Sequence, residues 1–401
     1  MIIRPMTLSL LLRSRLPVSA NSLQGLASRS TAKRLKAGFS ILALLQATSA
    51  AHAADLAAAD AVVLVKAIQA YAARDKEFAL ERALRSFEAP GAVQIATQRK
   101  NESDAESCAW PMRKSAEVSE DEWQALRRSI TPQVGESGCS SYVLIDMDED
   151  GQRDVLQRTY VGGTGLFTQY SVYKRIGQRF VTPSADSKAK VKQGDDEGSE
   201  LFSIGDRGGN QWYEMVRLQG RFYVAYVEGS FGQDLVILLR PAAHPSGVAA
   251  LSVNYRYQFS VPRRQNFGPE GQRRRVDLSP ALQSTLERAL ARYVTERPTK
   301  ALPQVCPVPA GASEEEQTRY ASFGPGHYSI ETVADFPFWW QGHCHVAQLI
   351  SWFGRYDRKD GLFNMLRVRR ADKDEQGLEY VVRARRQMVG VGVDGARASP
   401  R

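Results

Sequence analysis

A short acidic run with aspartate at alternate positions constrains this chain most: Asp146-Met147-Asp148-Glu149-Asp150-Gly151. In a calcium loop of the EF-hand type, oxygen ligands come from positions 1, 3, 5, 7, 9 and 12, and glycine at position 6 allows a sharp turn. Counted from the first aspartate, the ligand positions hold Asp146, Asp148, Asp150, the carbonyl of Gln152, Asp154 and Gln157. The run therefore predicts a turn that closes around a calcium ion.

The last position departs from this pattern. Gln157 offers one neutral oxygen where a bidentate glutamate is expected, so we expect modest, micromolar-to-millimolar calcium affinity. Such weak binding suffices outside the cell, where modules with dissociation constants of about 0.1 to 1 mM are typical. The neighbouring carboxylates, including that of Glu149, repel one another unless a cation lies between them. An acidic surface turn without a metal is the alternative interpretation.

The segments on both sides of the turn, 141–145 and 154–161, are rich in β-branched and apolar residues. They predict strand-turn-strand rather than the helix-loop-helix of a true EF-hand. The spacing Asp-x-Asp-x-Asp-Gly-x-x-Asp over Asp146–Asp154 resembles the calcium turn of FG-GAP and VCBS-type secreted β proteins. The resemblance is confined to this turn, and one copy is present where a propeller repeats its unit. It implies a structural calcium ion and no activity.

The N-terminal residues 1–53 contain seven Lys or Arg and no Asp or Glu. A basic group over 33–36, an apolar stretch over 39–45 and the A-x-A site Ala51-His52-Ala53 predict a bacterial Sec signal peptide and a periplasmic or secreted protein. The stretch before the basic group is long for such a signal, so translation can begin downstream of Met1. A mitochondrial transit peptide is the alternative, because such peptides are also rich in Arg and Ser.

The signal peptide changes the charge balance. Without its seven positive charges the chain keeps 46 basic and 44 acidic residues, a net charge of +2 instead of +9. Nucleic-acid binding thereby loses its main support. No later run reaches the roughly 18 to 20 apolar residues that a membrane span needs. Two groups of arginines remain, either as sites for lipopolysaccharide, anionic lipid or an acidic partner or as solvated surface: Arg263 and Arg264 with 273–275, and Arg367, Arg369 and Arg370 with Arg383, Arg385 and Arg386.

Four cysteines follow the predicted signal peptide: Cys108, Cys139, Cys306 and Cys344. In an oxidising compartment an even number indicates disulfides, although four cysteines allow three connectivities. Proximity in sequence favours Cys108 with Cys139 and Cys306 with Cys344. On the loop-closure account each bridge adds about 3 to 4 kcal/mol to stability. Free buried thiols are the alternative.

Residue patterns predict an α+β fold, with an N-terminal helical segment followed by a mostly antiparallel sheet region and one packed helix. Apolar residues at helical spacing predict a helix over 56–87, and Ser119 with Glu122 forms a capping box for a helix to about Arg128. The predicted organisation is a helical segment over 54–137, an antiparallel β region over 138–298 that ends in a helix from Ser279-Pro280, a connector over 299–318, a C-terminal β section over 319–390 and a disordered tail over 391–401. A charged loop is predicted over 184–200.

His343 and His345 are the strongest candidates for chemistry outside the turn. Residues two apart in a strand share a face, so both imidazoles are able to hold zinc, while Cys344 faces the other way and suits a disulfide. A third ligand is required and none lies nearby at metal spacing, so His327 or Asp335 serves only if the fold brings it in. Ordinary strand histidines are the simpler interpretation, so zinc is not favoured.

No serine, cysteine or zinc hydrolase motif is present in the sequence. The aromatic run Phe336-Pro337-Phe338-Trp339-Trp340 suits a sugar or peptide platform, although such residues more often fill a core or cover a sheet edge. The sequence therefore favours a non-catalytic binding or accessory protein of the cell envelope that recognises a protein or glycan. A periplasmic hydrolase that uses a metal at His343 and His345 is the alternative.

Overall fold

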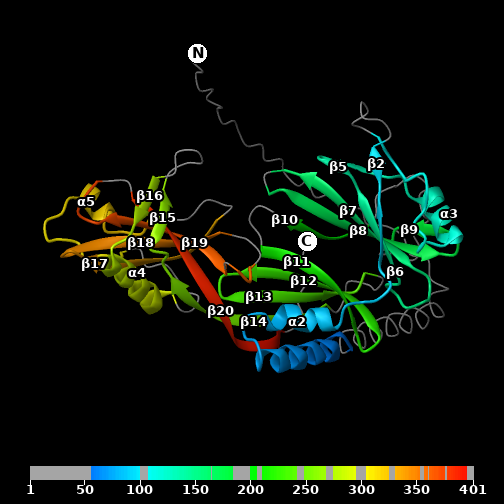
Figure 1. The fold of residues 1–401 in the computed structure, drawn as a ribbon, viewed down its shortest axis with the longest axis horizontal. Coiled ribbons are helices and arrows are strands. Elements are labelled where there is room, and N and C mark those ends of the chain that lie inside the picture. Colours follow the sequence, from blue (N-terminus) through cyan, green and yellow to red (C-terminus); the bar gives the residue numbers. More distant parts are fainter. Residues whose placement is uncertain are drawn as a thin grey trace, which may run out of the picture. The chain divides into compact units, whose positions relative to one another are not determined.

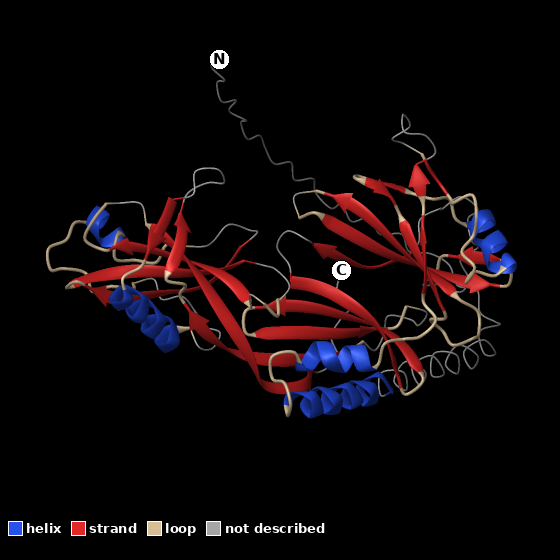
Figure 2. Cartoon of the chain, in the orientation of Figure 1, coloured by secondary structure: helices blue, strands red, loops and turns tan. Residues whose placement is uncertain are grey.

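The fold is α+β and mostly antiparallel sheet, as the sequence predicts (Figure 2). The computed structural model describes residues 56–99, 107–163, 165–183, 199–205, 210–241, 248–267, 274–294, 304–324, 330–352, 356–359, 361–374 and 377–394. The predicted signal peptide over 1–53, His327 and residues 395–401 lie outside these ranges. In the described part no helix is long and apolar enough to cross a membrane.

The acidic turn belongs to a six-stranded sheet with the order β1-β6-β7-β8-β10, in which β9 pairs with β8. Its strands are β1 (Val93–Ala96), β6 (Ser141–Ile145), β7 (Asp154–Gly162), β8 (Phe167–Ile176), β9 (Arg179–Val181) and β10 (Ser199–Gly205). Helix α3 (Glu120–Ser129) packs Trp123 and Leu126 against buried Tyr142 of this sheet. Its predicted capping box is confirmed, since the Ser119 hydroxyl accepts from the Glu122 N–H and the Glu122 carboxylate accepts from the Ser119 N–H.

A second, eight-stranded sheet has the order β11-β12-β13-β14-β20-β19-β18-β17 (Figure 1). Its strands are β11 (Asn210–Leu218), β12 (Arg221–Ser230), β13 (Gln233–Leu239), β14 (Ala249–Ser260), β17 (Ile330–Trp340), β18 (His343–Trp352), β19 (Leu362–Arg370) and β20 (Leu378–Asp394). The turns after β11 and β17 are Gln-Gly pairs, and all four residues have positive φ. Such turns match the twist of antiparallel hairpins.

The eight-stranded sheet packs on both faces. On one face lie the helix over 56–72, α2 (Ala79–Ser86) and α4 (Pro280–Tyr293), which share a core with alternate residues of the strands. On the other face, β12 and β13 pack Tyr226 and Ile237 against Leu156 and Phe202 of the six-stranded sheet. Period-two alternation therefore buries both faces of β12 and β13, which explains their nearly continuous apolar sequence.

A buried ion pair holds the first helix to the sheet. Asp60 is fully buried, and its carboxylate accepts from Arg221 Nε at 2.7 Å, from Arg221 Nη2 at 2.6 Å and from the Tyr223 hydroxyl at 2.7 Å. A buried carboxylate requires such partners, because desolvation of an unpaired charge is costly. The same arrangement fixes where the helix over 56–72 meets β12.

The remaining elements of the described residues are short. They are β2 (Gln98–Arg99) with β3 (Cys108–Ala109), β4 (Val134–Gly135) with β5 (Gly138–Cys139), β15 (Arg264–Phe267) with β16 (Arg274–Asp277), and α5 (Glu314–Thr318). The four strands β1 to β4 lie inside the segment over 54–137 that was predicted to be helical. Helix α5 has its own capping box, from Ser313 and Glu316, inside the predicted connector.

The prediction of one continuous helix over 56–87 is wrong, because the helix is interrupted near its middle. The helix over 56–72 ends, and α2 starts at Ala79. Between them the Asp75 carboxylate accepts from the N–H groups of Glu77 and Phe78. An aspartate that satisfies backbone donors locally competes with helix continuation, and that is why apolar periodicity alone missed the break.

Three predicted boundaries also change. Strand β14 pairs with β20, so the C-terminal β section over 319–390 continues the sheet formed by β11–β14 across the predicted connector. Strand β20 extends to Asp394, into the predicted disordered tail. Strand β10 begins at Ser199, inside the predicted charged loop, of which residues 184–198 are not described. Long-range strand pairing supplies the stability that local composition does not reveal.

Candidate metal centre

Three carboxylates of the acidic turn come together. Asp146 follows β6, Asp148 lies in the turn, and Asp154 is the first residue of β7; one oxygen of each lies within 4.8 Å of the others. The antiparallel pairing of Ile145 with Asp154 closes the turn and brings its two ends together. In the described part of the chain this is the one group of three such side chains that could hold a metal ion.

Backbone N–H groups orient these carboxylates. Asp146 accepts from the N–H of Glu149 at 2.8 Å and of Gly151 at 3.2 Å, and Asp154 accepts from the N–H of Met147 at 3.1 Å. Gly151 has a φ of 85°, in the region that glycine adopts at no steric cost. The glycine of the motif therefore has the role that the sequence predicts for it.

The charges of the turn are only partly compensated. Asp154 is 1 % exposed, and burial raises the pKa of its carboxyl to about 6, with a smaller contribution in the same direction from Asp148 and Asp150. Hydrogen bonds from the N–H groups of Arg175 and Met147 oppose that rise. The Lys174 ammonium forms an ion pair with Asp148 and brings one positive charge to the cluster. A divalent cation would supply two and would favour the ionised form of Asp154.

Two predicted participants lie elsewhere. Asp150 is outside the triad and accepts from the N–H of Gln152 at 2.8 Å. Glu149 has a φ of 67°, and its carboxylate accepts from the N–H of Phe222 in the other sheet at 2.6 Å. The crowding predicted for four neighbouring carboxylates is therefore reduced, because Glu149 is used to join the turn to β12. The Gln152 carbonyl, at the seventh position of the motif, stays a predicted ligand.

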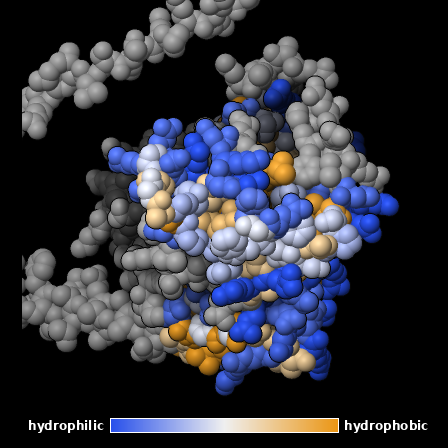
Figure 3. All heavy atoms as spheres, turned by 90° about the vertical axis from the view of Figure 1, so that its left-hand side faces the viewer, coloured by the Kyte–Doolittle hydropathy of each residue, from blue (hydrophilic) through white to orange (hydrophobic). Residues whose placement is uncertain are grey.

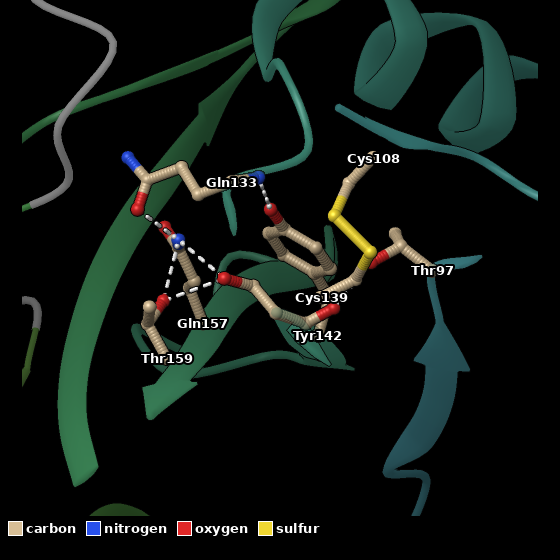
Figure 4. The surroundings of a disulfide bond; sticks show 8 residues. Thr97, Cys108, Gln133, Cys139, Tyr142, Gln157 and Thr159 are labelled. Atoms are coloured by element: carbon tan, nitrogen blue, oxygen red, sulfur yellow. Dashed lines mark hydrogen bonds between the residues drawn. A yellow bond between two sulfur atoms is a disulfide. The ribbon is translucent and has the colours of Figure 1, made fainter. Parts of the chain in front are cut away.

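Gln157 is separated from the triad by the alternation of β7. Asp154 and Gln157 lie three residues apart in the strand, so their side chains point to opposite faces. The Gln157 amide nitrogen donates to Gln133 at 2.6 Å and Thr159 at 3.0 Å (Figure 4). Its amide oxygen accepts from the Tyr173 hydroxyl at 2.9 Å. The structure thus engages Gln157 in a buried polar network, in disagreement with its predicted place at position 12.

The turn also contacts the second sheet through its backbone. Arg217 of β11 donates from Nη2 to the carbonyl of Asp146 at 3.3 Å, in addition to the contact of Glu149 with Phe222. The acidic turn is therefore a point where the two sheets are hydrogen-bonded to each other. Any ion that orders the turn also orders this contact.

Both disulfides connect the cysteines that proximity in sequence favours. Cys108 bridges Cys139, and Cys306 bridges Cys344; free cysteines are absent. The first bridge lies beside Tyr142 and the Gln157 network (Figure 4). The second joins the segment 304–324 to β18, where Cys306 packs with buried Val346. Two disulfides are typical of proteins in an oxidising extracellular or periplasmic compartment.

His343 and His345 share one face of β18 and Cys344 lies on the other, as predicted. The His343 Nδ1 lies 3.1 Å from Asp372, which also pairs with Arg370. His345 is mostly buried, stacks on Phe338 at 4.9 Å between ring centroids, and its Nδ1 lies 3.2 Å from the His343 carbonyl. Burial lowers the pKa of His345, with nearby Arg370 acting in the same direction.

Within the described ranges, no third side chain forms a metal-binding group with both histidines. Asp335 lies on β17 at an odd-numbered position, whereas His345 pairs with Phe338 at an even-numbered position, so the two side chains face opposite sides of the sheet. Asp335 accepts instead from the N–H of Phe323 at 3.3 Å. His327, the other predicted ligand, lies outside the described residues.

The aromatic run of β17 is divided between core and surface. Phe336 and Phe338 are buried, Trp340 packs beside them, and Trp339 is 61 % exposed. The side of the protein that carries α5 and β17 is mostly hydrophilic, with hydrophobic groups in separate patches (Figure 3). Strand alternation thus separates the run into side chains that point to opposite faces, and a continuous aromatic platform does not form.

Several arginines of the second predicted group are paired with carboxylates of the chain, and one of them, Arg386, is buried. Arg386 is 3 % exposed and pairs with Glu81 and, at 3.1 Å, with Asp234. Arg367 pairs with Glu379 and Arg370 with Asp372, at 2.9 and 2.6 Å. The Arg386 site has no local signal in the sequence, because its partners lie in α2 and β13, far away along the chain.

No family model, curated protein or solved structure matches the chain.

Proposed function

We propose that this is an exported, non-catalytic binding or accessory protein of the cell envelope, with a structural calcium ion in the turn over Asp146–Asp154. One observation carries the proposal: three aspartate carboxylates converge to within 4.8 Å in a turn that also hydrogen-bonds to the second sheet. Oxygen-only ligation from carboxylates and carbonyls suits calcium, which is abundant outside the cytoplasm. The two disulfides support the same compartment.

Calcium titration by calorimetry tests the metal. We expect a dissociation constant of about 0.1 to 1 mM for the wild type, the range of extracellular calcium modules. Asp148→Asn should weaken binding at least tenfold, because it removes a charged ligand of the triad. The matched control is Asp374→Asn, whose side chain is 89 % exposed and distant in sequence from the turn. Equal affinities for both variants and the wild type would refute the site.

Export and binding need separate tests. The mature N-terminus determined by mass spectrometry after expression in a bacterium should be Ala54, the residue after the A-x-A site. The immobilised protein should then retain an envelope protein or glycan in millimolar calcium and release it in chelator. Cytoplasmic retention of the whole chain would contradict the compartment, and hydrolysis of an ester, glycan or peptide substrate would contradict the absence of catalysis.

A further inference from the structure

Two buried carboxylates share one guanidinium where α2 packs on the eight-stranded sheet. The Arg386 site consists of Arg386 of β20, Asp234 of β13 and Glu81 of α2. Their side chains are 3 %, 5 % and 14 % exposed, in that order. With all three groups ionised, two negative charges therefore face one positive charge in a region from which water is largely excluded.

The contacts of the guanidinium are divided among three acceptors. Its Nη1 lies 3.1 Å from an Asp234 oxygen, its Nη2 pairs with Glu81 Oε1, and its Nε donates to the Glu77 carbonyl at 2.9 Å. The second oxygen of Glu81 is buried and accepts no hydrogen bond from the described residues. A buried acceptor or charge that lacks a partner is costly. One proton shared by the two carboxylates would remove the excess charge.

Tyrosines complete the immediate surroundings of the site. The rings of Tyr255 and Tyr356 lie 4.4 and 4.3 Å from the guanidinium carbon, and Tyr257 of β14 also interacts electrostatically with it. Burial raises the pKa of all three hydroxyls, that of Tyr356 to about 12, so they are uncharged near neutral pH. On the β12 side, Gly229 comes so close that a Cβ there would lie 2.9 Å from Asp234 Oδ1. These neighbours add no positive charge to the site.

Further charged groups of the surrounding elements are matched among themselves or face an aromatic ring. They are Glu77 with Arg385 at 2.7 Å, Asp75 with Arg82 at 2.8 Å, and Arg358 over Phe78 at 5.0 Å from the ring centroid. Glu77 and Asp75 precede α2, and the side chain of Arg385 lies on the opposite face of β20 from that of its neighbour in the site. These contacts leave the excess negative charge of the Arg386 site in place.

We propose that the Arg386 site is a pH-sensitive contact between α2 and the sheet. It takes up one proton, shared by its two carboxylates, as the pH falls from neutral to mildly acidic, and then holds α2 more firmly. Burial raises the pKa of the Asp234 carboxyl from the usual 3.8 to about 6; the charge of Arg386 opposes this rise, and that of Glu81 adds to it. A carboxyl whose pKa is higher in the folded than in the unfolded chain stabilises the fold when protonated, and this contribution is lost as the pH rises through about 6. Because the two carboxylates interact, the proton belongs to the pair rather than to one residue.

Urea denaturation across this pH range tests the proton. Asp234→Asn replaces the carboxylate with a neutral group of the same shape, so the variant lacks the titration. Between about pH 7.5 and pH 5, the folding equilibrium constant of the wild type should rise about tenfold relative to that of the variant. The control Asp374→Asn, with an 89 % exposed side chain, should follow the wild type at each pH. The buried Asp154 titrates equally in all three chains, so it cancels in the comparison.

A second variant separates the proposal from a purely structural role of Asp234. Glu81→Gln removes the neighbouring charge and leaves Arg386 to Asp234 alone, so the Asp234 carboxyl should titrate about one pH unit lower. Carbon-13 NMR of labelled carboxyl groups follows this titration in the folded protein. In hydrogen exchange of the wild type between about pH 7.5 and pH 5, protection of the Arg82 N–H in α2 should rise about threefold more than that of the Trp123 N–H in α3.

Three results would overturn the proposal. They are parallel pH profiles of the wild type and Asp234→Asn, an Asp234 carboxyl that titrates near its usual 3.8, and a titration that Glu81→Gln does not move. Equal changes in protection at Arg82 and Trp123 would refute the tightening of α2. If Asp234→Asn does not fold, the NMR titrations of the wild type and Glu81→Gln decide by themselves.

Discussion

The acidic turn and the site around Arg386 both concentrate charge, but they balance it differently. In the turn, three carboxylates meet the single ammonium of Lys174. Around Arg386, one guanidinium lies between Asp234 and Glu81 and over the rings of Tyr255 and Tyr356, at 4.4 and 4.3 Å. The Arg386 guanidinium is almost fully buried among partners from α2, β13 and β14, whereas the carboxylates of the turn have only one cationic partner.

The difference separates two roles. Arg386 joins β20 to β13 and α2, and it also donates from Nε to the Glu77 carbonyl at 2.9 Å, so it secures the helix against the sheet. The turn joins β6 to β7 and reaches the second sheet by two hydrogen bonds. We infer that contacts within the chain are enough to stabilise the Arg386 site, whereas the stability of the turn depends on cations from solution.

Removal of the buried guanidinium should have the largest effect. Arg386→Met leaves Asp234 and Glu81 buried without their counter-charge, so we expect the free energy of unfolding to fall by about 3 to 5 kcal/mol. Urea denaturation measures this change. The control, Arg367→Met, removes an exposed pair with Glu379 and should cost less than about 1 kcal/mol. Similar losses for both variants would contradict the comparison.

Calcium should stabilise the turn by a smaller amount. Free calcium at about 100 times the dissociation constant adds about 2.7 kcal/mol if only the folded state binds it. We expect chelation to lower the melting temperature by several degrees and to increase hydrogen exchange at Met147, Gly151 and Phe222. The N–H of Arg386, which donates to Tyr356, serves as the internal control and should exchange at the same rate. An unchanged melting temperature would rule out the calcium role.

The ion pair of Glu122, in helix α3, should make the stability of the fold depend on pH. Burial alone would raise the pKa of Glu122, but hydrogen bonds from Arg153 and Ser119 lower it from 4.5 to about 2. A lowered pKa stabilises the fold above pH 4.5, and this contribution disappears as pH falls towards 2. Glu122→Gln should therefore cost about 2 kcal/mol at pH 7 and little near pH 2, as measured by urea denaturation across pH. A pH-independent difference from the wild type would contradict this account.

The smallest effect should come from Lys174. Its ammonium competes with a metal ion for Asp148, so Lys174→Met should bind calcium about three- to tenfold more tightly, a change of about 1 kcal/mol. Calorimetric titration measures it, with Lys373→Met, an exposed lysine in the turn after β19, as the control. Weaker binding in the Lys174 variant would show that the lysine supports the turn.

Local signals predicted much of the fold. The capping box of α3, the Ser279-Pro280 start of α4 and the strands on both sides of the turn depend on neighbouring residues, and each is confirmed. The break between the helix over 56–72 and α2, and the pairing of β14 with β20, were missed. They depend on a side-chain contact of Asp75 and on segments more than 100 residues apart, which periodicity does not record.

The candidate metal site was predicted in part for the same reason. Asp146, Asp148 and Asp154 converge because a short hairpin brings them together, whereas Gln157 was lost when β7 continued as a strand and turned its side chain away. Strand alternation is thus enough to remove one residue from a predicted site.

The sequence by itself determined the short-range features: the closure of an acidic turn between two strands, the helix caps, and the pairing of cysteines close in the chain. Only the tertiary structure decided which charges are matched, because Asp60, Asp234 and Glu81 meet their arginines through contacts between remote elements. The sequence does not distinguish a buried charged residue from an exposed one. Burial and partners, which depend on the packing of the whole chain, decide whether it stabilises the core or remains available for a ligand.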